Sequence, residues 1–302
     1  MTDNPYKNGC AWIEGNYVPI SEARIPITDT GFTRSDLTHD VVAVWNRKFF
    51  RLEDHLNRFE RNWKRLRMNP KHSREERREI LIECVRRSGI QNAYVQMIMT
   101  RGVAPSGVRD PRLFENRFYA YTIPYVWLVK YEDHEVGIHL VVCKEVIRIP
   151  PKAVDPTVKN FHWADLVRGL FEAYDRDAFA GVLVDEKGNL TEGPGFNLFA
   201  YHNGILLTPA SGVLEGITRQ TVLDLAGEQG IVTKLDMFDA DVLKAADEVF
   251  ISSTAGGVIP VTTLDGRQVG DGKPGKVTML LRRRYWEAHD EDRWTIPVDY
   301  PE

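Results

Sequence analysis

The stretch from Gly212 to Ala226 contains residues that could bind an anion. A turn with two glycines, Gly212-Val-Leu-Glu-Gly, directly precedes an amphipathic stretch that is predicted to be a helix. Backbone N–H groups of Ile217 and Thr218 would point outward at the start of that helix, where the helix dipole favours negative charge. The segment therefore predicts a phosphate cradle. Taken alone, a capped helix after an ordinary surface turn is the simpler interpretation.

Two other motifs are set aside on their own chemistry. Gly270-Asp-Gly-Lys-Pro-Gly-Lys-Val has the spacing of a nucleotide-binding phosphate loop, but Val277 stands where a magnesium-binding Ser or Thr is needed. Asn189-Leu-Thr matches a glycosylation sequon and is interpreted as a turn, because no secretory signal peptide is expected. The sequence also contains no Gly-x-Ser-x-Gly elbow, no His-Glu-x-x-His motif and no cluster of Cys and His. It therefore supports neither a serine hydrolase nor a metal site.

Composition limits the classes of partner. The chain has 302 residues, 43% of them hydrophobic, which is enough for a large core and favours two subdomains. The net charge of -4 argues against binding to nucleic acid or to an anionic membrane. No apolar run approaches the roughly 18 residues of a membrane-spanning helix. Cys10, Cys84 and Cys143 lack metal or redox spacing, so they are predicted to be buried side chains of a cytoplasmic protein.

Residues 1–127 are expected to form a small N-terminal α/β domain. Hairpins are predicted at residues 11–20 and 41–50, and single strands at 93–100 and 118–126. One helix is predicted from apolar residues spaced alternately four and three apart, which are Leu52, Leu56, Phe59, Trp63 and Leu66. A second helix should cover residues 74–87 and end at Gly89.

A linker is expected at residues 128–134, followed by a larger C-terminal domain over residues 135–302. Its predicted strands are 137–147, 179–185, 196–201 and 205–208, the last three of which are expected to pair as an antiparallel meander. Its predicted helices are 163–176, 218–229, 240–246 and 276–289. The whole chain is therefore predicted to have a mixed α/β fold.

Four segments, in this order along the chain, carry a family resemblance. They are Thr157-Val-Lys-Asn-Phe-His-Trp-Ala-Asp-Leu, Leu190-Thr-Glu-Gly-Pro-Gly-Phe-Asn-Leu-Phe, Leu214-Glu-Gly-Ile-Thr-Arg and Ser253-Thr-Ala-Gly-Gly-Val-Ile-Pro. Together they resemble the fold type IV aminotransferases that depend on pyridoxal phosphate. This broad family includes branched-chain and D-amino-acid aminotransferases and aminodeoxychorismate lyase.

Further motifs resemble one group of that family, the (R)-selective amine transaminases. They are Asp29-Thr-Gly-Phe, Ser35-Asp-Leu-Thr, Phe50-Arg-Leu, Asp54-His-Leu, Asp155-Pro-Thr-Val-Lys-Asn, Pro124-Tyr-Val-Trp and Thr262-Thr-Leu-Asp-Gly. The resemblance runs from about residue 11 to residue 286. It implies a C-terminal domain built as a pseudo-barrel of mostly antiparallel strands, with the cofactor in the cleft between the two domains.

The resemblance assigns roles at the cofactor ring. Lys159 corresponds to the catalytic lysine that forms the Schiff base with the cofactor and then carries the substrate proton. Glu192 corresponds to the carboxylate that faces the pyridine nitrogen, and Leu214 to the side chain beneath the ring. Without the resemblance, Lys159 is one basic residue among 39, and Glu192 is an ordinary solvated strand start.

For the cofactor phosphate, the resemblance implies Arg58, the backbone N–H groups of Ile217 and Thr218, and the hydroxyl of Thr254. On the predicted helix of residues 52–66, His55 and Arg58 lie about 60° and 120° from the centre of the apolar face. Arg58 could reach inward from that margin. By position alone, Arg58 would instead be an exposed helix charge.

The resemblance also implies residues that contact the substrate. Arg109, in the loop from Gly102 to Pro111, is the candidate for a mobile arginine that holds a keto-acid carboxylate, and an exposed loop arginine without a function is the alternative. Phe196 and Ala255 are expected to line the substrate pockets.

Two residues depart from the pattern of the (R)-selective group. Relatives carry a histidine where Arg34 stands and a tyrosine where His39 stands. His39 is expected to make the pocket smaller and more basic near neutral pH, and Arg34 is expected to offer a carboxylate partner.

The predicted activity is reversible transfer of an amino group from an (R)-configured primary amine to pyruvate or a related keto acid by a cytoplasmic homodimer. The extra basic residues leave a D-amino-acid or branched-chain aminotransferase open as the alternative, and a lyase resembling aminodeoxychorismate lyase as a third. A non-catalytic binding protein that retained the fold is the remaining alternative.

Overall fold

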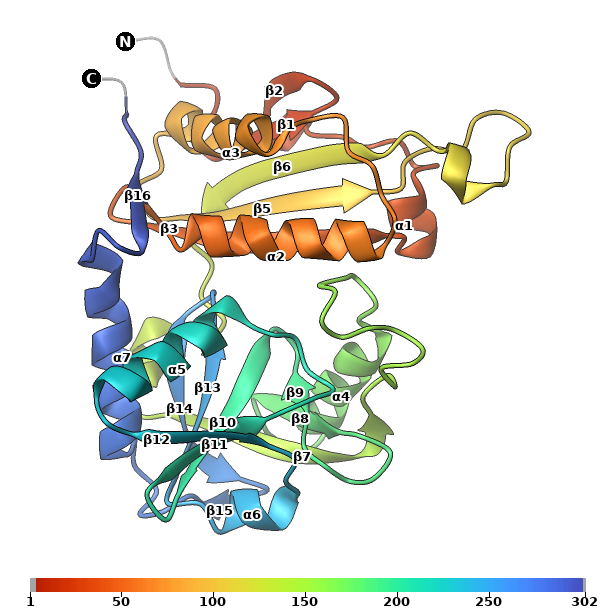
Figure 1. Cartoon of the computed structure of the whole chain (residues 1–302). Helices are drawn as coiled ribbons and strands as arrows, with labels where there is room; N and C mark the ends of the chain where they lie inside the picture. The colour runs from red at the N-terminus through yellow and green to blue at the C-terminus, as the bar shows by residue number, and fades with distance from the viewer. Residues whose placement is uncertain (1–3, 301–302) are drawn as a thin grey trace. The chain divides into compact units, whose positions relative to one another are not determined.

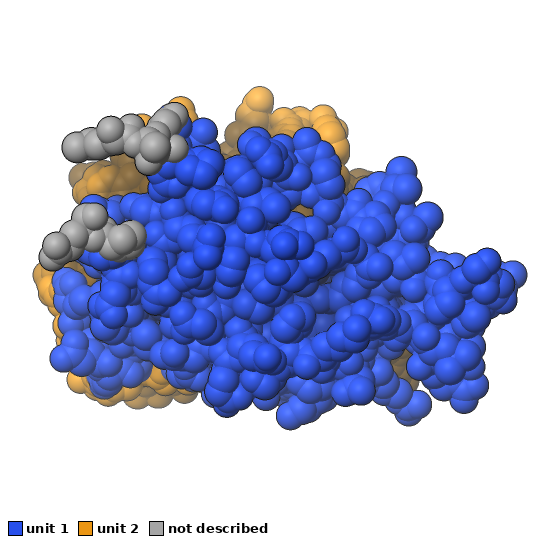
Figure 2. Space-filling model, turned by 90° about the horizontal axis from the view of Figure 1, so that it is seen from above, with its two compact units in different colours: residues 1–126, 158–161, 289–302 blue, residues 127–157, 162–288 orange. Residues whose placement is uncertain are grey.

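The computed structural model describes residues 4–300, which form two compact units (Figure 2). Among the described residues, unit 1 takes in 4–126, 158–161 and 289–300, and unit 2 takes in 127–157 and 162–288. The domain ranges inferred from the sequence are continuous, whereas unit 1 combines three separate segments. One consequence is that Lys159 belongs to unit 1 with the N-terminal residues.

Unit 1 contains an antiparallel sheet with the strand order β16-β4-β3-β5-β6-β1-β2 (Figure 1). The strands are β1 (Cys10–Ile13), β2 (Asn16–Pro19), β3 (Leu37–Trp45), β4 (Lys48–Phe50), β5 (Ala93–Thr100), β6 (Arg117–Pro124) and β16 (Thr295–Pro297). Both predicted hairpins are confirmed, because β1 pairs with β2 and β3 with β4. The C-terminal strand β16 pairs with β4 and so completes the sheet from the far end of the chain.

Helices α2 (Leu52–Arg65) and α3 (Arg74–Ser88) pack on this sheet and share its core. Unit 1 also contains α1 (Thr30–Arg34) and the short 3₁₀ helices η1 (Ile20–Glu22) and η2 (Pro111–Leu113), and the 3₁₀ helix η4 (Ala288–Asp290) begins one residue before its last segment. Leu52, Leu56 and Phe59 of α2 are fully buried in one core with Val42 and Val44 of β3, as the predicted spacing requires. The helix α3 ends at Gly89, whose φ of 70° is the left-handed conformation that glycine favours at a C-cap.

Strand β3 separates two sets of side chains. Successive residues of a strand point to opposite faces, so Asp40 lies on the same face as Val42 and Val44, which pack with α2. His39 lies on the opposite face. Strand β3 therefore presents a carboxylate to the helix side and an imidazole to the other side.

Unit 2 contains a mixed sheet with the strand order β12-β11-β10-β13-β14-β7-β8, to which β9 and β15 add short pairings. The strands are β7 (Ile138–Ile147), β8 (Ala180–Val184), β9 (Glu192–Gly193), β10 (Phe196–His202), β11 (Ile205–Pro209), β12 (Val232–Asp236), β13 (Glu248–Ser253), β14 (Gly257–Leu264) and β15 (Arg267–Gln268). The central strands β11, β10, β13 and β14 pair antiparallel. Both ends of the sheet are parallel, at β12 and at β7 with β8.

The helices of unit 2 begin and end close to the predicted residues. They are α4 (Ala164–Tyr174), α5 (Ile217–Glu228), α6 (Ala240–Lys244) and α7 (Lys276–Glu287), preceded by the 3₁₀ helix η3 (Tyr131–Glu135). Among the helices of residues 4–300, none is long and apolar enough to cross a membrane.

The predicted three-strand meander is wrong in one respect. Strands β10 and β11 pair antiparallel as expected, but β8 pairs parallel with β7 and not with β10. The reason is the helix between β7 and β8, because a parallel pair needs a crossover connection and α4 supplies it. After the turn at residues 187–189, the chain therefore pairs with the end of β8 through an isolated bridge between Val184 and Leu190.

The loop at residues 270–275, part of the segment that resembles a nucleotide-binding motif, leads into a helix whose start already holds a side-chain carboxylate. Helix α7 follows it directly, and the carboxylate of Glu248 occupies the helix start by accepting from the N–H groups of Val277 (3.0 Å) and Thr278 (2.7 Å). A Cβ on Gly275 would lie 2.0 Å from the Glu248 carboxyl carbon. A side-chain carboxylate thus takes the place that a phosphate would need.

Candidate active site

The backbone around Lys159 is held by hydrogen bonds within unit 1. The carbonyl oxygen of Lys159 accepts from the Thr38 hydroxyl at 2.8 Å and from the His39 N–H at 3.1 Å. The Asn160 side-chain amide donates to the Val158 carbonyl at 2.7 Å. These bonds tie a short segment to β3 and fix the backbone from which the Lys159 side chain projects.

His39 is buried with only 5% of its surface exposed, and its ring packs 4.4 Å from the ring of Phe161. Among the described residues, neither ring nitrogen of His39 has a hydrogen-bond partner. Burial, followed by the charge of Lys159, lowers the pKa of His39 well below its ordinary value. The expectation that His39 makes the site more basic near neutral pH is therefore wrong, because its imidazole is neutral there.

Arg58 lies in a buried ion pair on the helix side of β3. Its Nε and Nη2 donate to the two carboxylate oxygens of Asp40 at 2.8 and 2.7 Å. His55 Nδ1 lies 2.8 Å from Asp40 Oδ1. Arg58 is 4% exposed and Asp40 fully buried, so the alternative of an exposed helix charge at Arg58 is wrong.

The ionisation of Asp40 follows from this pairing. Burial alone would raise the pKa of the Asp40 carboxyl, but the Arg58 guanidinium and then His55 outweigh burial and hold that pKa well below its usual range. A folded-state pKa below the unfolded value means that Asp40 contributes stability above about pH 4, which is lost as the pH falls further.

Replacing Asp40 by Asn is expected to lower the free energy of unfolding by about 3–5 kcal/mol at pH 7, because the buried guanidinium of Arg58 loses its charged carboxylate partner. The matched control is Asp54→Asn, which breaks the pair of Asp54 with Arg51 at a more exposed position and is expected to cost less than about 1 kcal/mol. Urea unfolding of both variants measures the difference. The Asp40→Asn deficit should shrink between about pH 5 and pH 3, and a deficit independent of pH would contradict the pairing.

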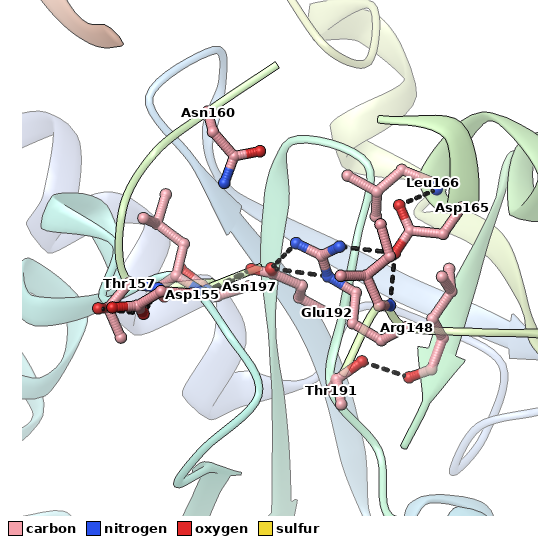
Figure 3. A network of polar contacts seen from close by, with 12 residues as sticks. Arg148, Asp155, Thr157, Asn160, Asp165, Leu166, Thr191, Glu192 and Asn197 are labelled. Atoms are coloured by element: carbon pink, nitrogen blue, oxygen red, sulfur yellow. Dashed lines mark hydrogen bonds and ion pairs between the residues drawn. The ribbon is translucent and has the colours of Figure 1, made fainter. Parts of the chain in front are cut away.

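Glu192 of unit 2 sits in a buried polar network (Figure 3). Its Oε1 accepts from Nε and Nη2 of Arg148 at 3.3 and 3.2 Å. Its Oε2 accepts from the Leu214 N–H at 2.9 Å and, more distantly, from Asn197 Nδ2 at 3.5 Å. The third guanidinium nitrogen of Arg148 donates to Asp165 Oδ2 at 2.6 Å. Glu192 is therefore a fixed, buried carboxylate and not a solvated strand start.

The three ionic side chains of this network, Arg148, Asp165 and Glu192, are here called the Arg148 cluster. Each of these side chains is 7–8% exposed. One guanidinium and two carboxylates give these three side chains a formal net charge of −1, and the buried guanidinium of Arg219 also interacts electrostatically with Glu192. A buried negative charge is costly unless a cation approaches it. The cluster is therefore suited to a cationic partner at Glu192.

The anion cradle was predicted at the start of α5. Gly216 is the N-cap and has no side chain with which to cap the first turn, so the N–H groups of Ile217 and Thr218 come first in the helix. A Cβ on Gly216 would lie 2.2 Å from Asn197 Oδ1, which requires glycine there. Asn197 Nδ2 also donates to the Leu214 carbonyl at 2.9 Å, linking this turn to Glu192.

Thr254 and Ala255 follow β13 in a tight turn of unit 2. The Ser253 hydroxyl donates to the Gly195 carbonyl at 2.8 Å and accepts from the Ala255 N–H at 3.2 Å. The next residue but one, Gly257, has a φ of 72° and a Cβ there would meet the Tyr285 ring at 2.5 Å. The turn that carries Thr254 is thereby fixed against β10 and α7.

The remaining predicted substrate residues have different surroundings. Arg34, the last residue of α1, and Arg109 are both exposed on unit 1. Phe196 is 4% exposed in the hydrophobic core of unit 2, where its ring lies against Gly193. The structure therefore gives Phe196 a packing role in the described chain.

Several residues of these networks were not singled out from the sequence. Arg148 and Asp165 come from separate elements, and nothing in their spacing from Glu192 indicates a contact. The sequence did contain a signal for Asp40. A carboxylate directly before an apolar run, close to a predicted helix with His55 and Arg58 on its margin, favours an ion pair.

Comparisons with known proteins identify the family of the chain. The family model described as Amino-transferase class IV matches residues 38–264. A putative branched-chain-amino-acid aminotransferase of Methanocaldococcus jannaschii is 28% identical over 289 residues, 95% of this chain and 98% of the relative. A D-alanine aminotransferase of Staphylococcus haemolyticus is 28% identical over 277 residues, 91% of this chain and 95% of the relative.

Solved structures are similar over the same length. The branched-chain amino acid aminotransferase of Thermobaculum terrenum, in its PLP form, has a TM-score of 0.87 and 25% identity, and the match covers 97% of this chain and 99% of that one. The match of the family model to residues 38–264 includes Lys159, Glu192, Arg58 and the start of α5. The chain belongs to the class IV aminotransferases, with their fold type IV architecture.

Proposed function

We propose that the protein is a pyridoxal-phosphate-dependent transaminase that moves an amino group from an (R)-configured primary amine to pyruvate or a related keto acid. The main support for a pyridoxal-phosphate cofactor is the Arg148 cluster, whose net negative charge fits a protonated pyridine ring. The uncapped start of α5 fits a phosphate. The similar Thermobaculum terrenum structure is a PLP-bound form. The donor groups of this chain therefore suit the cofactor.

By the family resemblance, the residues that would hold the cofactor are Lys159, Arg58, Glu192, Leu214, Ile217, Thr218 and Thr254. When bound, the cofactor supplies an electron sink for the electron pair left by deprotonation of the substrate carbon.

The proposed chemistry of the chain's own residues is proton transfer by Lys159 and charge stabilisation by Glu192. The amine of Lys159 would take the proton from the donor carbon as a general base and deliver it as a general acid within the same half-reaction, and in the second half-reaction it would deliver a proton to the acceptor carbon. The Glu192 carboxylate would accept a hydrogen bond from the protonated ring nitrogen of the cofactor and so stabilise that proton. The bonds from Thr38 and His39 to the Lys159 carbonyl keep the lysine backbone in place during this transfer.

The choice of an (R)-amine rests on the motifs of that group and on the neutral state of His39. A neutral imidazole gives a substrate carboxylate no fixed positive charge, which favours uncharged groups on the donor. A D-amino-acid or branched-chain donor is the second candidate. It is supported by the relatives named for those reactions and by the exposed Arg34.

A donor panel separates these candidates. Reconstituted protein is given (R)- or (S)-1-phenylethylamine, D-alanine or L-leucine, each with 2-oxobutyrate as the acceptor. The proposal predicts 2-aminobutyrate and acetophenone from the (R)-amine at a rate at least about tenfold above that of any other donor, a difference of about 1.4 kcal/mol in transition-state binding. Faster turnover of D-alanine or L-leucine would favour the second candidate. Pyruvate release from an amino-carboxylate without an acceptor would favour a lyase.

We also propose that the enzyme is a homodimer in the cytoplasm. The family resemblance supports the dimer. The state of Cys10, Cys84 and Cys143, which are all free and buried, supports a reducing compartment.

A further inference from the structure

Arg148 contacts the carboxylate that the proposed function assigns to the pyridine ring, but no role has been given to Arg148 itself. It reaches Glu192 with two nitrogens and Asp165 with the third (Figure 3). All three side chains are buried. The guanidinium fork is therefore fixed in one plane between two acids.

The two acids are not equivalent. Asp165 Oδ2 accepts from the Ile149 N–H at 2.8 Å, and Asp165 Oδ1 from the Leu166 N–H at 2.9 Å. Asp165 also lies in the first turn of α4, where the helix dipole favours an anion. Glu192 accepts from the Leu214 N–H, but it lies in the two-residue strand β9 and has no helix dipole to favour its charge. If the guanidinium were removed, Asp165 would keep more support for its charge, so a proton would go to Glu192.

We infer that Arg148 is a positioning residue that keeps Glu192 ionised and correctly oriented, and thereby keeps the ring nitrogen of bound pyridoxal phosphate protonated. Asp165 holds Arg148 in place beside Glu192. This inference rests on the proposed function. Beyond that function, it says that Arg148 determines the charge state of the cofactor ring by acting through Glu192.

The test compares Arg148→Gln with a matched control, Arg176→Gln. Arg176 also bridges two acids in unit 2, Glu172 and Asp265, but does not contact Glu192. Each apoprotein is titrated with pyridoxal phosphate and with its 1-deaza analogue, which lacks the ring nitrogen. The ¹⁵N chemical shift of ring-labelled cofactor reports protonation directly.

For Arg148→Gln we expect the ¹⁵N signal of an unprotonated ring and a loss of pyridoxal phosphate affinity of about tenfold or more, as is typical when an outer partner of a binding group is removed. Affinity for the deaza analogue should change much less. At saturating cofactor, kcat should fall with little change in the KM for the amine. The Arg176→Gln control should match the wild type in the ¹⁵N shift, in both cofactor affinities and in kcat and KM.

Two further variants keep the test decisive if Arg148→Gln does not fold. Arg148→Lys retains the positive charge, and Asp165→Asn leaves Arg148 on Glu192, so both should keep a protonated ring. An unprotonated ring in either variant overturns the inference, as does equal loss of affinity for both cofactors in Arg148→Gln. A wild-type protein that binds no pyridoxal phosphate would instead overturn the proposed function, which separates the two failures.

Discussion

Lys159→Ala is expected to lower kcat by about 10⁴-fold, the upper range for loss of a positioned acid–base group. The lysine is the one residue assigned both to the covalent link with the cofactor and to the proton transfer, so no second group of the described site replaces it. Its backbone is anchored through its carbonyl oxygen, to Thr38 and His39, and these bonds do not involve the side chain that is removed. The variant should therefore fold as the wild type does.

The measurement is a steady-state amine transfer assay together with circular dichroism. Lys152→Ala is a suitable control, because Lys152 is an exposed lysine in the loop that precedes the same segment. It should keep near wild-type kcat. A folded Lys159→Ala protein with wild-type turnover would refute the assignment of Lys159.

Glu192→Gln is expected to lower kcat by about 10²–10³-fold, comparable with removal of one preorganised electrostatic partner from other active sites. The amide keeps the size of the side chain but removes the negative charge of the Arg148 cluster, which then becomes neutral. The ring nitrogen then loses the partner that keeps it protonated. Because the substrate amine does not contact Glu192 in this proposal, its KM should change little.

Glu186→Gln provides the control for this substitution, since Glu186 is exposed in the turn after β8. The assay is run at saturating cofactor so that weaker cofactor binding does not appear as a lower kcat. An increase in KM at unchanged kcat would show that Glu192 acts in substrate binding and not on the ring.

The elements were predictable where a local pattern determines them. The four-and-three spacing of Leu52, Leu56 and Phe59 defines α2, and Gly89 marks the end of α3. Strand pairing was less predictable, because pairing is set by contacts distant in sequence. Thus β8 was assigned to the wrong neighbour although the helix that makes it parallel to β7 was itself predicted.

The same holds for the candidate site: motifs and local patterns indicated some of its residues, and only the fold determined the others. Family motifs indicated Lys159, Glu192 and Arg58, and local geometry indicated the start of α5. Charge states were not accessible from the sequence: the imidazole of His39 is neutral because of its burial and the neighbouring Lys159. Likewise, Arg148 becomes relevant only when the fold brings the end of β7 to Glu192.

The most direct test of the account is to find which lysine carries the cofactor. The protein is loaded with pyridoxal phosphate, reduced with borohydride, digested and examined by mass spectrometry. The account predicts a phosphopyridoxyl group on Lys159, and loss of this label in Lys159→Ala. A stoichiometric label on another lysine, or no label in a protein that transfers amino groups, would contradict it.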